Sequence, residues 1–202
     1  MKRTNSLVSK WLPIAAAALC MGAVQAGAVT IDFGPSFGAP GSNWAILTNQ
    51  LAPWGVTFST TGSDGIYWWG PGVYGSYAIS EGPTWGPNPH GTDPIRMNFS
   101  VYVNQVSIRG FNGGVDTDTM TLRAYNHSNQ LVASNQITST FSTAGHTLTV
   151  AAPNIAYAIV QSNAPLSGLF FDDLVFVPEP ASGLILLGGL ACLMRRRACL
   201  KP

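Results

Sequence analysis

The stretch of the sequence whose residue types are best suited to bind a ligand is GIYWWGPGVYGSYAISEGPTWGPNPHG, residues 65–91. Aromatic rings stand there among glycines and prolines, and the face of such a ring, held in a concave site, can stack on a sugar. Oxygen atoms that can accept hydrogen bonds from sugar hydroxyls lie in or just after the stretch, on Glu81, Asn88 and Asp93. The candidate glycan contacts are Tyr67, Trp68, Trp69, Tyr74 and Trp85.

Two of these rings, Trp68 and Trp69, are neighbours in the chain. Successive side chains of a β-strand point to opposite faces, so one of the two rings must point away from the core if the pair lies on a strand. That outward ring is the best single candidate for a ligand contact. The alternative is that the rings of this stretch cover one edge or one end of the fold.

A second group that could do chemistry is a pair of carboxylates, Asp32 in IDFG and Asp172 in LFFDDLVF. Strand alternation places Asp172 on the same side as Phe170, Leu174 and Phe176, where an ionised group is costly unless it is paired or bound to a cation. Asp32 becomes a partner if the first and last strands lie side by side. The two would then hold a structural calcium ion together with backbone carbonyls. The alternative is that Asp172 caps a strand end or faces water.

The sequence offers little to a catalytic mechanism. His90, His127 and His146 lack metal-ligand spacing, and the chain has neither a GxSxG nor an HExxH motif. A glycosidase needs two suitably placed carboxylates. Glu81 is the only glutamate between residues 29 and 177, so aspartate would have to serve in these roles. We expect no enzymatic activity, and no cofactor apart from the calcium ion considered above.

Composition narrows the class of protein. Of the 202 residues, 46% are hydrophobic and only 9% are charged, against roughly 25% charged in an average soluble domain. Between Val29 and Val177 three basic and eight acidic residues give a net charge of −5. Such a surface offers no patch that would neutralise phosphates, so nucleic acid is not an expected partner.

The body of the chain is predicted to form short strands. Alternating runs separated by Gly, Pro, Asn and Asp begin at residues 29, 55, 96, 105, 119, 130, 146, 155 and 169. Runs of this length at spacings of about ten residues predict an all-β fold, an antiparallel β-sandwich with jelly-roll topology, in one domain at 29–176.

The N-terminus predicts export. Residues 1–26 combine Lys2, Arg3 and Lys10 with an apolar run and the small residues of VQAGA, the pattern of a secretory signal peptide. Signal peptidase would cleave after Ala26 or Ala28. The apolar run is shorter than the ~20 residues that a membrane span needs.

The C-terminal residues 177–202 hold a different signal. Val177, Pro178, Glu179 and Pro180 precede an uncharged run, 181–194, and the cluster Arg195, Arg196 and Arg197. Fourteen residues make a helix of about 21 Å at ~1.5 Å per residue, short for a membrane unless the arginines reach the headgroups. The arginines would stay cytoplasmic under the positive-inside bias. Prolines hold the tripeptide extended, which displays Glu179 as a lone, accessible carboxylate.

This tail resembles the PEP-CTERM sorting tail of Gram-negative bacteria. The resemblance implies an inner-membrane intermediate, processing by an exosortase, and delivery to the cell surface or the extracellular polysaccharide matrix. The alternative is an ordinary C-terminal anchor. The strand order is also similar, more loosely, to jelly-roll ectodomains of such proteins, which resemble carbohydrate-binding-module sandwiches. The expected function is an exported, non-catalytic surface or matrix protein. A polysaccharide-binding module is the alternative, and a hydrolase is a weaker one.

Overall fold

A computed structural model describes residues 27–37, 45–61, 65–73, 76–81, 93–112, 117–140, 142–162 and 169–180. Residues Gly27–Glu179 form one compact unit. The predicted signal peptide and the run 181–194 lie outside the described residues. Among the residues that are described, no helix has the length and apolar character of a membrane span.

The described chain is almost entirely β-structure. Its strands are β1 Val29–Ile31, β2 Ala45–Ile46, β3 Val56–Thr60, β4 Ile66–Val73, β5 Ser76–Glu81, β6 Ile95–Asn112, β7 Asp118–Tyr125, β8 Leu131–Ser139, β9 Ser142–Ser162 and β10 Leu169–Pro178. Two short 3₁₀ helices, η2 Pro35–Phe37 and η3 Ala52–Trp54, lie between the early strands. Every strand pairing is antiparallel among these elements.

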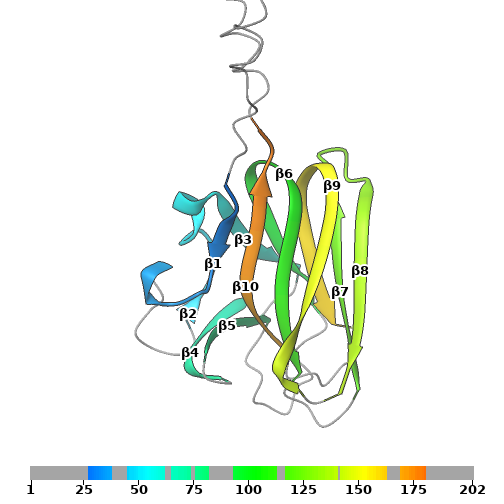
Figure 1. Ribbon diagram of the computed structural model, residues 1–202. Coiled ribbons are helices and arrows are strands. Elements are labelled where there is room, and N and C mark those ends of the chain that lie inside the picture. The colour runs from blue at the N-terminus through cyan, green and yellow to red at the C-terminus, as the bar shows by residue number, and fades with distance from the viewer. Residues whose placement is uncertain are drawn as a thin grey trace, which may run out of the picture. The chain divides into compact units, whose positions relative to one another are not determined.

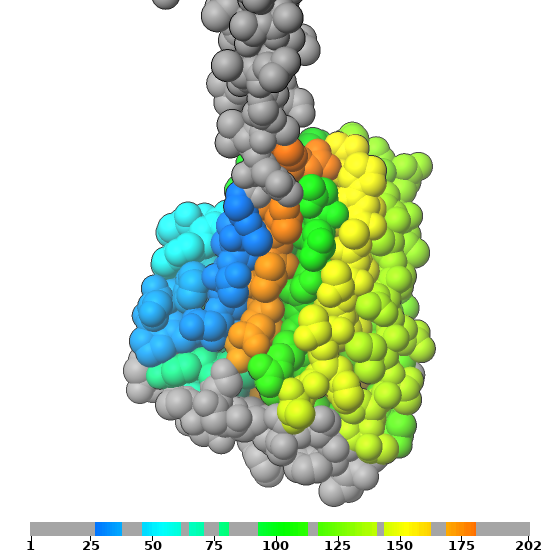
Figure 2. All heavy atoms as spheres, in the orientation of Figure 1, coloured from blue at the N-terminus to red at the C-terminus, as the bar shows by residue number. Residues whose placement is uncertain are grey.

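The two long strands β6 and β9 belong to both layers of a sandwich. The second half of β6 pairs with β10 and with the first half of β9, and β1, β5, β4 and β2 extend this first layer. The first half of β6 pairs with β3 and with the second half of β9, and β7 and β8 complete the second layer. Figure 1 shows β6 and β9 bending at one end, and Figure 2 shows β1, β10, β6 and β9 side by side on the near face.

The main core lies between the layers. Strand alternation supplies it with Ile95 and Met97 from β6, Leu122 from β7 and Val160 from β9, all buried. A second, smaller cluster lies on the opposite face of the first layer and consists of Trp69, Ala78, Phe111 and Phe170. The strands around β4 and β10 are therefore covered on both faces.

A bulge in β10 changes which side chains reach the main core. Asp173 has a positive φ of 49°, and the pairing of β10 with β6 shifts register between Asp172 and Val175. Phe171 and Leu174, three residues apart, both contact the main core, whereas Phe170 belongs to the second cluster. The prediction that Asp172 shares a side with Leu174 and Phe176 is therefore wrong, because an extra residue in a strand reverses the alternation.

The antiparallel β-sandwich predicted from the sequence is confirmed, and so is the pairing of the first strand with the last, β1 with β10. The jelly-roll topology stays a prediction. Two details of the strand assignment are wrong. The runs at 96 and 105 form the single strand β6, and those at 146 and 155 form the single strand β9. The aromatic stretch is not among the predicted strands, but its described residues form the hairpin β4–β5.

Gly110 on β6 marks a close approach of side chains, which yields a first prediction. A Cβ atom at this position would lie 3.2 Å from Cε1 of Phe171 and would overlap Sδ of Met120. Gly110→Ala should therefore lower the free energy of unfolding by about 1–3 kcal/mol, the usual cost of overpacking. Urea denaturation measures it. An unchanged midpoint would show that the core has room at this position.

Candidate functional site

The outer face of the second layer carries the described residues best suited to bind a ligand. In the first half of β6 and the second half of β9, side chains alternate between the core and the outer face. On β7, Arg123 and Tyr125 also point outward. Arg96 and Asn98 on β6 flank the buried Met97, and Tyr157 on β9 precedes the buried Ala158. This follows from the two-residue period of a strand with one face in the core.

Strand register aligns these outward residues in two adjacent rows. One row runs Thr57, Asn98, Tyr157, Tyr125 and Leu131, across β3, β6, β9, β7 and β8. The other runs Ser59, Arg96, Ile159, Arg123 and Ser134 across the same strands. We call the set Arg96, Asn98, Arg123, Tyr125 and Tyr157 the stacked face.

Its centre is a stack of three planar groups. The guanidinium carbon of Arg96 lies 3.6 Å from the ring centroid of Tyr157, a cation–π contact. The rings of Tyr157 and Tyr125 are stacked, with centroids 4.9 Å apart and planes at 9°. Because β6 and β7 lie on opposite sides of β9, both faces of the Tyr157 ring are covered, and this residue is only 7% exposed. Tyr125 is partly exposed and is the ring of the pair that a ligand can reach.

Hydrogen bonds fix the orientation of the polar groups around the stack. Nε of Arg96 donates to Oδ1 of Asn98 at 2.7 Å, and Nδ2 of Asn98 lies 3.3 Å from Oγ of Ser59. On the other side, the hydroxyl of Tyr157 donates to Oδ1 of Asn129 at 3.1 Å. The planar groups are thus held in place before any ligand arrives, which lowers the entropic cost of binding.

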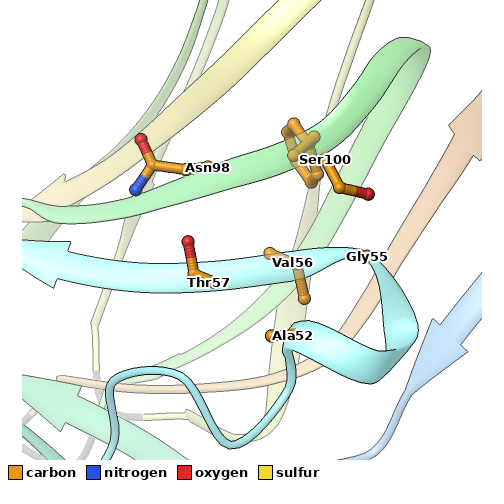
Figure 3. A pocket seen from close by; sticks show the side chains of 7 residues that line it. Ala52, Gly55, Val56, Thr57, Asn98 and Ser100 are labelled. Carbon is orange, nitrogen blue, oxygen red and sulfur yellow. The ribbon is translucent and has the colours of Figure 1, made fainter.

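A pocket of about 130 Å³ adjoins the stacked face at its β3 edge. Figure 3 shows Asn98 and Ser100 on β6 above Thr57 and Val56 on β3, with Ala52 of η3 below them. The pocket is too small for a sugar polymer, but it shares Asn98 with the stacked face.

The aromatic residues chosen from the sequence lie elsewhere. Trp68 is 1% exposed in the main core, and Trp69 is 5% exposed in the second cluster. The indole nitrogen of Trp68 donates to the carbonyl of Phe33 at 2.5 Å, and that of Trp69 to Oγ of Ser80 at 2.6 Å. The prediction of an outward tryptophan is therefore wrong, because both faces of this hairpin are covered.

Of the other candidate rings in the aromatic stretch, the structure describes Tyr67. Tyr67 is partly buried against the second cluster. Tyr74 and Trp85 lie outside the described residues. The alternative that these rings serve the fold therefore holds for Trp68 and Trp69.

The two carboxylates proposed for calcium differ in environment. Asp32 is exposed, and its Oδ1 accepts a hydrogen bond from the backbone N–H of Gly34 at 2.9 Å. Asp172 is 1% exposed within β10 and does not face water. Within the described ranges, no group of three or more His, Cys, Asp or Glu side chains could hold a metal ion. Calcium binding by Asp32 and Asp172 stays a prediction.

The predicted sorting motif begins inside the fold. Val177 and Pro178 are the last residues of β10 and pair with Gln105 and Val103 of β6. The N–H of Glu179 donates to the carbonyl of Tyr102 at 2.8 Å, and the Glu179 carboxylate accepts a hydrogen bond from the backbone N–H of Asn154. The carboxylate that the sequence predicts to be lone and accessible thus accepts a backbone hydrogen bond from β9, and Glu179 is partly exposed. Of the predicted cleavage residues, Ala28 is exposed just before β1, whereas Ala26 and Arg195, Arg196 and Arg197 lie outside the described residues.

Sequence reasoning missed the stacked face. Its residues occupy polar positions of the predicted strands, in IRMN, TLRAY and IAYA, where an arginine or a tyrosine is unremarkable. The one available signal was a tyrosine or arginine at the outward position of three separate strands. Only strand register shows that they meet.

Comparison with known proteins leaves the family open, since no family model and no curated protein matches the chain. Several solved structures resemble it. The K2 cleaved adhesin domain of Lys-gingipain is 14% identical with a TM-score of 0.47, covering 74% of this chain and 99% of that one. CBM29_1, a family 29 carbohydrate-binding module from Piromyces equi, is 8% identical with a TM-score of 0.39, covering 77% and 94%.

A third structure, an arabinose-bound GH51 α-L-arabinofuranosidase, is 10% identical with a TM-score of 0.43. The match covers 68% of this chain but only 24% of the arabinofuranosidase. At TM-scores below 0.5 these likenesses say nothing about what this chain binds.

Proposed function

We propose that this chain is an exported, non-catalytic surface or matrix protein that binds polysaccharide through the stacked face. The observation that carries the proposal is the rigid stack of Arg96, Tyr157 and Tyr125 with its hydrogen-bonded neighbour Asn98. Pre-positioned aromatic rings beside planar polar groups suit sugar rings, whose faces are apolar and whose edges carry hydroxyls.

The proposal predicts a loss of binding on removal of one ring. Tyr125→Ala should weaken retention of the protein in a polysaccharide affinity gel by about tenfold, which corresponds to about 1.4 kcal/mol of lost stacking. The matched control is Tyr102→Ala, because Tyr102 is a 44% exposed tyrosine that is not part of the stacked face. Equal retention of wild type and Tyr125→Ala would contradict the proposal.

The position of the tail supports the proposed route of export. β10 continues into Val177 and Pro178, and the compact unit ends at Glu179, so the predicted motif lies at the boundary of the fold. We infer that the tail directs the protein through an inner-membrane intermediate to an exosortase and then to the cell surface or extracellular matrix. Signal peptidase would release the N-terminus. Because Glu179 is bound to β9, processing requires that the end of β10 first separate from the sandwich.

A further inference from the structure

The stacked face differs in charge from the region 29–177 taken as a whole. Both rows contain an arginine or a tyrosine but no acidic residue, whereas the region 29–177 as a whole has a net charge of −5. Arg96 and Arg123 are two of the three cations of that region. The stacked face is therefore the part of the described surface that attracts an anion, since protein charges steer ligands of opposite sign.

The third cation, Arg109, is already neutralised. Its Nη1 lies 3.0 Å from Oδ2 of Asp173, and its Nε and Nη2 donate to the carbonyl of Ala144 at 3.1 and 2.7 Å. Neither Arg96 nor Arg123 forms an ion pair with any described residue. Both are partly exposed. Two positive charges of the stacked face are thus available to a ligand.

The geometry of Arg96 leaves its outer donors unused by the fold. Its guanidinium lies over Tyr157 and its Nε donates to Asn98, while no described residue accepts from either Nη atom. A guanidinium has five N–H donors in a planar fork that matches a carboxylate or a sulfate. The stack and the Asn98 bond hold the fork still, so little side-chain entropy remains to be lost on binding.

The spacing of the two arginines fits a repeating polymer. Arg96 on β6 and Arg123 on β7 both pair with Ile159 on β9, so their Cα atoms stand about 10 Å apart at a strand spacing of about 4.8 Å. A ligand that meets both arginines must therefore extend over about two strand spacings. Tyr125 is the neighbour of Arg123 on the same outward face of β7, two residues along the strand.

We propose that the ligand of the stacked face is an anionic polysaccharide whose negatively charged groups are received by Arg96 and Arg123. A sugar ring between or beside those groups stacks on Tyr125, and Asn98 and Ser59 bind hydroxyls at the β3 side. This inference rests on the proposed polysaccharide binding and adds the class of ligand. Carboxylate and sulfate ester share the required chemistry.

Affinity gels with three polymers test it on the purified protein. They contain polygalacturonate, dextran sulfate or unmodified dextran, and the variants are Arg96→Gln, Arg123→Gln and the control Arg109→Gln. We expect retention by an anionic polymer but not by dextran, about tenfold weaker for Arg96→Gln and for Arg123→Gln because each loses charge-assisted hydrogen bonds. Arg109→Gln should bind like wild type. Retention should fall with added NaCl, as exposed charge interactions do.

The outcomes separate this inference from the proposed function. Retention by polygalacturonate or by dextran sulfate alone supports the inference and assigns the charged group as carboxylate or sulfate. Equal retention by dextran, unchanged in both arginine variants, overturns the inference and leaves polysaccharide binding in place. An equal loss in Arg109→Gln would show non-specific charge attraction and also overturn it. No retention by any polymer counts against both proposals. Arg123→Gln keeps the test valid if loss of the Arg96–Tyr157 contact unfolds the Arg96 variant.

Discussion

Trp68→Ala is expected to lower the free energy of unfolding by about 3–5 kcal/mol, the usual cost of deleting a buried aromatic side chain. Trp68 is 1% exposed and lies edge-on to Phe33, with ring centroids 6.3 Å apart and planes at 90°. Its indole nitrogen also binds the carbonyl of Phe33, which lies just after β1. The ring therefore links the β4–β5 hairpin to the first strand of the chain.

Urea denaturation at fixed temperature measures this loss as a lower midpoint at unchanged slope. Trp54→Ala is the matched control, because Trp54 is a tryptophan that is 36% exposed on η3. We expect the control to cost much less. A Trp68→Ala variant as stable as wild type, with weakened glycan binding, would instead return Trp68 to the list of ligand contacts.

The second large effect concerns the route of the protein in the cell. Replacing Pro178, Glu179 and Pro180 together by alanine should abolish release and leave the precursor in the inner membrane. Mass spectrometry of native wild-type protein should find a new C-terminus close to Pro180, without Arg195–Arg197. The physical reason is that alanines remove the fixed φ of two prolines and the carboxylate at once. Release of the triple variant at the wild-type rate, or an intact tail on the mature protein, would contradict the sorting proposal.

Glu179→Gln refines this experiment. Glutamine keeps a side-chain oxygen that can accept the N–H of Asn154 but loses the charge. If the variant is processed slowly while its urea midpoint stays at the wild-type value, the enzyme reads the charge of Glu179. If it is processed like wild type, the charge is dispensable and the prolines carry the recognition.

Strands with one face in the core and the other exposed to solvent could be predicted from the sequence. β3 alternates in this way, and β8 alternates between exposed and half-buried residues. The positions of β3, β7 and β8 agree with the runs found in the sequence. The β4–β5 hairpin was missed because its glycines and prolines favour turns. Its strand character comes from pairing, such as Trp68 opposite Ile79, which local composition does not encode.

The candidate site likewise depends on contacts between residues that are far apart in the chain. Arg96 and Tyr157 are sixty-one positions apart in the numbering, and their contact depends on the register Asn98 opposite Tyr157. One residue of slip would turn each side chain to the other face. Conversely, Trp68 and Trp69 looked available because a strand was assumed to have one free face, and the second cluster under Trp69 removes that face.

The sequence alone determined an all-β sandwich from alternation, and an acidic body with few charged residues from composition, because both depend on near neighbours or on counts. The tertiary structure decided which aromatic rings are buried, where Glu179 is held, and that Arg96, Tyr157 and Tyr125 form one stack. Those outcomes depend on which strands pair, in which register, and on what covers each face. These are contacts between residues far apart in the chain, and no local pattern specifies them.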